Sequence, residues 1–92
     1  MEIKHAAAAG TLESSDIMVT VLPETEGIRI SLTSSVEQYY GDSIRETMTK
    51  VLEELEVKNA HIEAVDHGAL DCTIRARLTT AVRRACREEE AL

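Results

Sequence analysis

The sequence predicts an α+β fold in which a small, mainly antiparallel sheet is covered on one face by two helices. The chain has 92 residues, enough for one domain with a small core, so residues 1–92 are predicted to form a single domain. Four segments carry strand patterns, and two longer segments carry helical periodicity. Their order along the chain is strand, strand, strand, helix, strand, helix.

The first three strands are predicted in the N-terminal third of the chain. Residues 2–12 form the first, despite a run of alanines, and the Ser-Ser-Asp string at 14–16 follows as a turn. Residues 17–22 are rich in β-branched side chains, which favours a buried strand. Residues 23–27 contain the single proline and form a turn. Apolar and polar residues then alternate over 28–33, which is typical of a half-buried strand.

At residue 34 the pattern changes to apolar residues at steps of three and four, which marks one face of a helix. This helix contains Gly41, which either bends it or marks its beginning. Its apolar stripe consists of Val36, Tyr40, Ile44, Met48, Val51, Leu52 and Leu55.

The last strand is predicted over residues 60–65. A second helix follows over residues 69–87, although residues 72–78 also alternate and so allow a short strand there. The helix is preferred because its stripe is longer. The core predicted between sheet and helices contains Ile30, Ile44, Leu52, Ile62, Ile74 and Leu78.

Charge and composition argue against two classes of partner. The net charge is −7, and aromatic residues make up only 2% of the chain. An acidic surface repels phosphate backbones, and single-strand binding uses basic grooves with stacked aromatics. No apolar run approaches the length of a membrane span, and the N-terminus lacks a signal-peptide pattern. The sequence therefore predicts a cytoplasmic protein that binds neither nucleic acid nor membrane.

The two cysteines fit a reducing compartment. If residues 69–87 form one helix, Cys72 and Cys86 lie about 21 Å apart along its axis. A disulfide requires Cα atoms within about 7 Å, so these two residues are predicted to be unpaired thiols. Their spacing does not suit a zinc site either.

Residue types suited to catalysis are scarce. His5, His61 and His67 are scattered, and none has a partner at the spacing of a metal site or a catalytic triad. The chain also lacks a glycine-rich phosphate loop and the common metalloprotease and hydrolase motifs. No catalytic or metal-ligating residue is therefore predicted, and a binding or carrier module is favoured over an enzyme.

Two serines are candidates for covalent attachment of a group. Ser43 follows Gly-Asp near the start of the first helix, and the string resembles the Asp-Ser-Leu attachment site of ordinary acyl carrier proteins. Ser14 lies in a predicted turn between two strands, where its hydroxyl can enter another enzyme's active site. On physical grounds either serine suits attachment. The simpler interpretation is that Ser43 is only a helix-surface residue and Ser14 only a turn residue.

The whole chain resembles the gamma subunit, or acyl carrier protein, of citrate lyase. The matching strings run in order from residue 1 to about residue 87, and together they are specific. They are Met1-Glu2-Ile3-Lys4, Ala9-Gly10-Thr11-Leu12-Glu13-Ser14, Ser34-Ser35-Val36-Glu37, Tyr40-Gly41-Asp42, Ile44-Arg45, Gly68-Ala69-Leu70-Asp71-Cys72 and Arg75-Ala76-Arg77. Malonate decarboxylase uses a related carrier, but the Gly-Thr-Leu-Glu-Ser and Gly-Ala-Leu-Asp strings favour citrate lyase.

The resemblance implies that Ser14 carries the prosthetic group of the family, a phosphoribosyl dephospho-coenzyme A that ends in a thiol. Ser15 stands where some members of the family have glycine. The implied partners are a transferase (alpha) subunit that exchanges acetyl for citryl, a lyase (beta) subunit that releases oxaloacetate, and the enzyme that attaches the group. The resemblance also disfavours Ser43, because the family does not use that position.

Acidic residues surround the predicted attachment site. Glu13 and Asp16 flank Ser14, and Glu24 and Glu26 are expected in a neighbouring turn. We expect the enzyme that loads Ser14, and the catalytic subunits, to approach this end with basic residues, because complementary charge raises association rates. Glu13 and Asp16 are both expected on an exposed turn.

Overall fold

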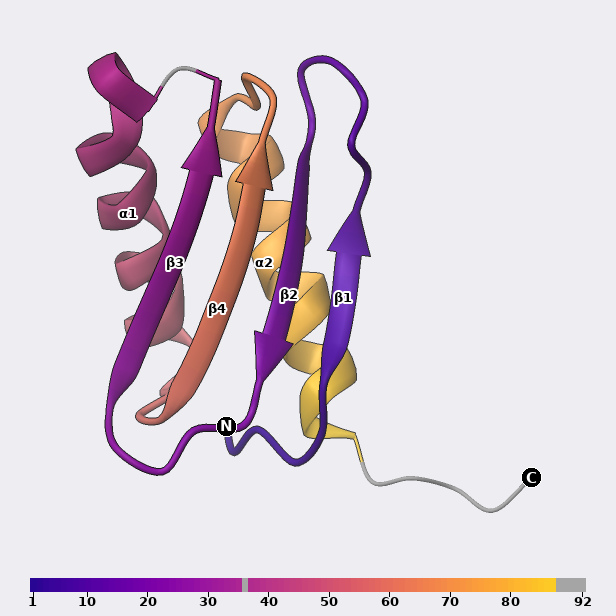
Figure 1. Cartoon of the computed structure of the whole chain (residues 1–92). Helices are drawn as coiled ribbons and strands as arrows, with labels where there is room; N and C mark the ends of the chain where they lie inside the picture. Colours follow the sequence, from indigo (N-terminus) through magenta and orange to yellow (C-terminus); the bar gives the residue numbers. More distant parts are fainter. Residues whose placement is uncertain (36, 88–92) are drawn as a thin grey trace.

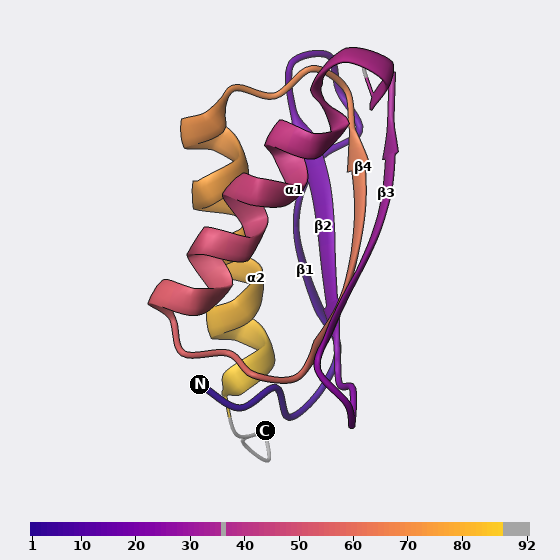
Figure 2. The ribbon, with the colours of Figure 1, turned by 90° about the vertical axis from the view of Figure 1, so that its left-hand side faces the viewer.

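A computed structural model describes residues 1–35 and 37–87. Within these residues the chain forms the six predicted elements in the predicted order (Figure 1). They are β1 (Ala7–Gly10), β2 (Ile17–Leu22), β3 (Ile28–Ser34), α1 (Glu37–Glu54), β4 (Ala60–Asp66) and α2 (Asp71–Cys86). Viewed along the edge of the sheet, both helices lie on the same face (Figure 2), so the predicted fold class is confirmed.

The strands form one mixed sheet in the order β1-β2-β4-β3. β1 and β4 each pair with β2 in antiparallel fashion, whereas β3 pairs with β4 in parallel. Parallel neighbours need a crossover, and α1 provides it between β3 and β4. The sheet is therefore mainly antiparallel, and β3, β4 and the β1–β2 loop meet at one end together with the starts of both helices (Figure 1). We refer to this end of the molecule, which includes the β1–β2 loop with Ser14, as the Ser14 end.

The core lies between the sheet and the two helices. In β2 the residues Ile17, Val19 and Val21 are fully buried and alternate with half-buried ones, as period-two patterning requires. Five of the six predicted core residues are buried: Ile44, Leu52, Ile62, Ile74 and Leu78. Ile30 packs against the core but stays half-buried, because β3 is an edge strand.

The first strand is shorter than predicted. Residues 2–12 were expected to be extended, but only Ala7–Gly10 pairs with β2. The backbone N–H groups of Lys4 and His5 donate instead to the carbonyl of Ala85, at 2.9 and 3.2 Å, at the end of α2. At the other end, Gly10 has a φ of 103°, and a β-carbon there would collide with the carbonyl of Ile17. The chain therefore turns at Gly10.

The helices settle two alternatives. Residues 72–78 belong to α2, so the strand interpretation of that segment is wrong, and Cys72 and Cys86 are free thiols on one helix. α1 begins at Glu37 and runs through Gly41, so Gly41 does not mark the beginning of the helix. The apolar stripe of α1 is buried from Ile44 to Leu52, whereas Tyr40 is 58% exposed, and Val36 lies outside the described residues. Neither helix within residues 1–35 and 37–87 is long and apolar enough to cross a membrane.

Candidate functional site

Ser14 lies on the loop that joins β1 to β2, at the end of the sheet where both helices begin (Figure 1). Its side chain is exposed. Among the described residues its hydroxyl has no hydrogen-bond partner, although the residues on either side of it are firmly held. The loop therefore presents a free hydroxyl on a fixed support.

The strongest support is a salt bridge between Asp16 and Arg77 of α2. The guanidinium donates from Nε to Oδ1 at 3.1 Å and from Nη2 to Oδ2 at 2.9 Å, the two-pronged geometry that Arg forms with carboxylates. The Thr11 hydroxyl donates to Oδ2 at 2.6 Å, and the Ile17 N–H donates to Oδ1 at 2.7 Å. The hydrogen bonds from Arg77, then those from Thr11 and Ile17, hold the pKa of Asp16 far below its usual range.

The position of Asp16 corrects the sequence expectation. Asp16 was expected on an exposed turn, but it is only 9% exposed, because its carboxylate closes the loop against α2. Glu13, by contrast, is exposed. Only Glu13 of this pair is therefore available to a partner, and Asp16 has a structural role.

A second support joins the loop to the segment that follows β4. The N–H of Ser15 donates to the carbonyl of His67 at 2.8 Å, and the N–H of His67 donates to the carbonyl of Asp16 at 2.9 Å. Ser15 has a φ of 64°, in the left-handed region that favours glycine. A glycine would therefore fit this turn without strain.

Buried Asp66 organises the β4–α2 segment in turn. It is 1% exposed, and its carboxylate accepts hydrogen bonds from the hydroxyl of Ser34 at 2.8 Å and from the N–H groups of Gly68 and Ala69 at 3.1 and 3.0 Å. The end of β3 and the start of α2 are thus tied to one carboxylate. The sequence analysis identified neither Asp66 nor Arg77. The signal for Asp66 was an acid directly after a buried strand, whereas Arg77 was one arginine among five in residues 67–87.

A cavity of about 400 Å³ opens beside these supports, between the first turns of α1 and α2. Its walls include the apolar side chains of Ile44, Leu70 and Ile74. Ser43, the alternative attachment residue, is an exposed residue on the α1 wall of this cavity. The structure therefore brings both candidate serines to the same end of the molecule, but only Ser14 lies on a loop.

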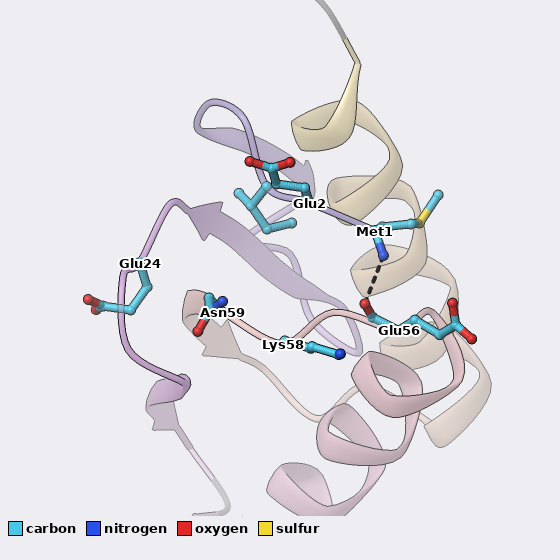
Figure 3. Close-up of a pocket in the computed structure, with 7 residues that line it drawn as sticks. Met1, Glu2, Glu24, Glu56, Lys58 and Asn59 are labelled. Carbon is cyan, nitrogen blue, oxygen red and sulfur yellow. Dashed lines mark hydrogen bonds between the residues drawn. The ribbon is translucent and has the colours of Figure 1, made fainter.

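A second cavity, of about 390 Å³, lies at the opposite end of the sheet. The terminal ammonium of Met1 donates there to the carbonyl of Glu56 at 2.8 Å, and the carboxylates of Glu2, Glu24 and Glu56 point away from one another (Figure 3). Nothing within residues 1–35 and 37–87 forms a group of three or more acidic, histidine or cysteine side chains that suits a metal ion.

The positions of Glu24 and Glu26 correct another expectation. Glu24 and Glu26 belong to the turn between β2 and β3, and β2 carries the chain away from Ser14 along the whole sheet (Figure 1). They lie at the opposite end and do not flank Ser14.

The histidines form no catalytic group. His5 bonds to the carbonyl of Arg87 through Nε2 at 2.8 Å, and His67 is exposed. On the open face of the sheet, Nε2 of His61 lies 3.0 Å from the Ser31 hydroxyl, while a nitrogen of Arg29 lies 3.5 Å from Nδ1. Arg29 can only donate, so Nδ1 accepts and Nε2 carries the proton. His61 then donates to Ser31 and does not activate it as a nucleophile.

The chain is similar to known acyl carrier proteins over most of its length. Residues 4–85 match the family model described as malonate decarboxylase delta subunit, an acyl carrier protein. The citrate lyase acyl carrier protein of Streptococcus mutans is 57% identical over 90 residues, which cover 97% of this chain and 88% of the relative. That of Halothermothrix orenii is 48% identical over 92 residues, which cover 100% of this chain and 98% of the relative.

Among solved structures, a chain in the Pseudomonas malonate decarboxylase hetero-tetramer in complex with malonate has the same fold. The TM-score is 0.79 at 20% identity, covering 90% of this chain and 86% of the other. At that identity the likeness concerns the fold alone. From the identities over nearly its whole length, the chain belongs to the family of citrate lyase acyl carrier proteins.

Proposed function

We propose that this protein is the acyl carrier subunit of a citrate lyase, and that it carries acetyl and citryl thioesters on a phosphoribosyl dephospho-coenzyme A arm joined to Ser14. The observation that carries this proposal is the exposed Ser14 hydroxyl, which is free of partners and stands on a loop held by α2 and the β4–α2 segment. When bound, the arm supplies a terminal thiol that holds the acyl group as a thioester.

The residues present fit this attachment. A hydroxyl that becomes a phosphodiester must be accessible to the loading enzyme and must tolerate a bulky substituent. Ser14 meets both requirements because its side chain is exposed. The neighbouring side chain of Asp16 is already neutralised by Arg77, so it adds little repulsion toward an incoming phosphate. In this proposal Thr11, Asp16 and Arg77 hold the loop in one shape, and Ser14 alone forms the bond.

The chain itself is not expected to catalyse a reaction. Within residues 1–35 and 37–87 there is no metal cluster, and the one histidine that contacts a serine hydroxyl, His61, fits the role of donor to Ser31. Its part is to present the arm to the transferase and lyase subunits in turn. A tethered acyl group meets both active sites at a high effective concentration without diffusing away.

The test is the mass of the chain after expression together with the citrate lyase maturation enzymes. We expect a mass increase equal to the phosphoribosyl dephospho-coenzyme A group, and peptide mapping should place it on Ser14 and not on Ser15. Ser14→Ala should abolish loading, whereas Ser43→Ala should leave it complete.

Two results would contradict the proposal. A smaller increase equal to phosphopantetheine, mapped to Ser43, would make the chain an ordinary phosphopantetheine carrier. An unmodified mass in the presence of active maturation enzymes would make it an interaction module without an arm.

A malonate decarboxylase-type carrier is the second candidate, because the matching family model and the structural neighbour both carry that name. The loaded chain separates the two. We expect it to support acetate release with citrate lyase transferase subunits, and not to support decarboxylation with malonate decarboxylase subunits.

A further inference from the structure

The cavity between the first turns of α1 and α2 opens at the Ser14 end, where the β1–β2 loop also lies (Figure 1). The N–H of Ser15 donates to the carbonyl of His67 at 2.8 Å, and the residue after His67 is Gly68, which lines the cavity. The path from Ser14 to the cavity rim therefore consists of one peptide step to Ser15, the hydrogen bond to His67 and one peptide step to Gly68. Its length is roughly 10–15 Å. An arm that carries a pantetheine unit beyond a nucleotide is longer than this.

The chemistry of the cavity wall specifies its occupant. Tyr40, Ile44, Ala69, Leu70 and Ile74 supply most of the wall, and Leu70 is 70% exposed, which is unusual for a large aliphatic side chain. The buried polar side chain on the wall is already engaged. Asp66 accepts hydrogen bonds from its own chain, and no buried side-chain polar atom within residues 1–35 and 37–87 lacks a partner. Most of the surface that remains open is apolar.

We propose that this cavity is a resting site for the end of the prosthetic arm, and that it takes the uncharged acetyl thioester and excludes the citryl thioester. This inference rests on the proposed function. A volume of about 400 Å³ lies within the range of roughly 300–1,000 Å³ typical of small-ligand pockets. An acetyl thioester has a methyl group and no hydrogen-bond donor, so an apolar wall suits it.

The exclusion of citryl follows from its charge. A citryl thioester keeps two carboxylates, and the carboxylates of Asp66 and Asp71 already line the cavity. Burying further negative charge beside them is strongly unfavourable, because no basic side chain lines the wall among the residues that the structure describes. Exchange of acetyl for citryl therefore moves the end of the arm from the cavity into solvent, where a partner subunit can take it.

The test compares amide NMR spectra of the unloaded and the acetyl-loaded protein, after intact mass has verified complete loading. Shift changes are expected at Ser43, Ile44 and residues 68–70, beyond those at the Ser14 loop. The cavity at the opposite end, of similar volume and lined by Lys58 and Asn59, should show none.

Two matched variants sharpen this test. Ser43→Phe places a ring in the cavity from an exposed helix position, and it should remove the shift changes at residues 68–70. Thr49→Phe adds the same ring to an exposed position of α1 outside the cavity, and it should leave them in place. Changes confined to residues 11–16, or changes that survive Ser43→Phe, would overturn the resting site while leaving the carrier role intact.

A charged cap tests the selectivity. In a Cys72→Ala background, which removes the exposed competing thiol, the arm thiol is capped with iodoacetamide or with iodoacetate. The two caps differ by a negative charge. The uncharged cap should retain the shifts at residues 68–70 and the carboxymethyl cap should lose them. Equal shifts with both caps would overturn the exclusion of citryl. A protein whose mass shows no arm would instead overturn the carrier role, and this inference with it.

Discussion

At the Ser14 end, the loop is held by a buried carboxylate that bonds to a side chain of α2, whereas the turn at the opposite end is held through backbone groups and an exposed salt bridge. Asp16 and Arg77 are 61 residues apart, and Ser34 and Asp66 are 32 apart. At the opposite end, the turn between β2 and β3 rests on the backbone of Gly27, which pairs with the Asn59 side chain and the Ala60 N–H. A salt bridge there, between Glu24 and Arg29, lies within the turn itself and is largely exposed on the arginine side.

The two ends also differ in their exposed surface. Four of the six large apolar side chains that the structure exposes lie at the Ser14 end: Leu12, Tyr39, Tyr40 and Leu70. Exposed apolar groups that gather at one place typically mark a binding surface. The Ser14 end is therefore the better suited of the two to contact other molecules.

The largest expected effect comes from the core that both ends share. Leu78 is fully buried on α2, and Leu→Ala changes at such sites cost about 2–5 kcal/mol of unfolding free energy. Leu78→Ala should lower the melting temperature by well over about 4 °C in a domain of this size. An unchanged thermal unfolding curve would place Leu78 outside the core.

A smaller effect, confined to the Ser14 end, is expected from Arg77→Ala. Without Arg77 the buried carboxylate of Asp16 loses both hydrogen bonds from that side chain of α2. Thermal stability and the rate of Ser14 loading should both fall. Arg75→Ala is the matched control, because Arg75 bonds to Glu54 on the surface and does not touch the loop. Equal losses in the two variants would show that the loop does not depend on Arg77.

Acid titration examines the same contact. The pKa of Asp16 is lowered by folding, so its ionised form stabilises the native state above its unfolded pKa of about 3.8. This contribution is lost as the pH falls below that value toward the folded pKa. Asp16→Asn should therefore be less stable than the unaltered protein at pH 7, and the gap should narrow only below about pH 4. A gap that closes near pH 6 would point to a different titrating group.

Backbone strain offers a comparison between the ends, because each has one non-glycine residue with positive φ. Ser15 has a φ of 64°, and Glu56, which follows α1 at the opposite end, has a φ of 56°. Glycine relieves the left-handed strain but loses more chain entropy, so each change to glycine should raise stability by at most about 1 kcal/mol. Ser15→Gly should keep Ser14 loading intact, which would also exclude Ser15 as the attachment residue. Loss of loading in Ser15→Gly, but not in Glu56→Gly, would contradict the assignment of Ser14.

The smallest effect concerns charge. Glu13→Lys at the Ser14 end should slow the association step of loading, and the difference should shrink as salt rises, since the Debye length falls from about 10 Å at 0.1 M to about 3 Å at 1 M. Glu26→Lys makes the same change at the opposite end and should have little influence. Identical, salt-insensitive kinetics for both variants would remove electrostatic docking at the Ser14 end.

The elements of this fold could be predicted because their signals are local. Period-two alternation located β3, and the apolar stripe on α2 outlasted the alternation of residues 72–78. Contacts between distant residues could not be predicted this way. Nothing near Asp16 in the sequence shows that Arg77 will bury it, because that contact exists only after α2 packs on β1 and β2.

The misplaced acids have a similar cause. Glu24 is close to Ser14 in sequence, but the six residues of β2 between them are extended and span about 20 Å. Ser14 itself was located by a resemblance of short strings. The structure adds why that position suits attachment: an exposed hydroxyl on a loop that other elements hold still.

The link between Asp16 and Arg77 has a consequence for the order in which the protein can be matured. When the ribosome has synthesised the chain only as far as residue 66, the Ser14 loop is complete in sequence. His67 and Arg77, which hold the loop in its native shape, have not yet been added. The loop reaches its native form only after α2 is made and packed. An enzyme that recognises the native loop therefore modifies finished, folded chains and passes over incomplete ones.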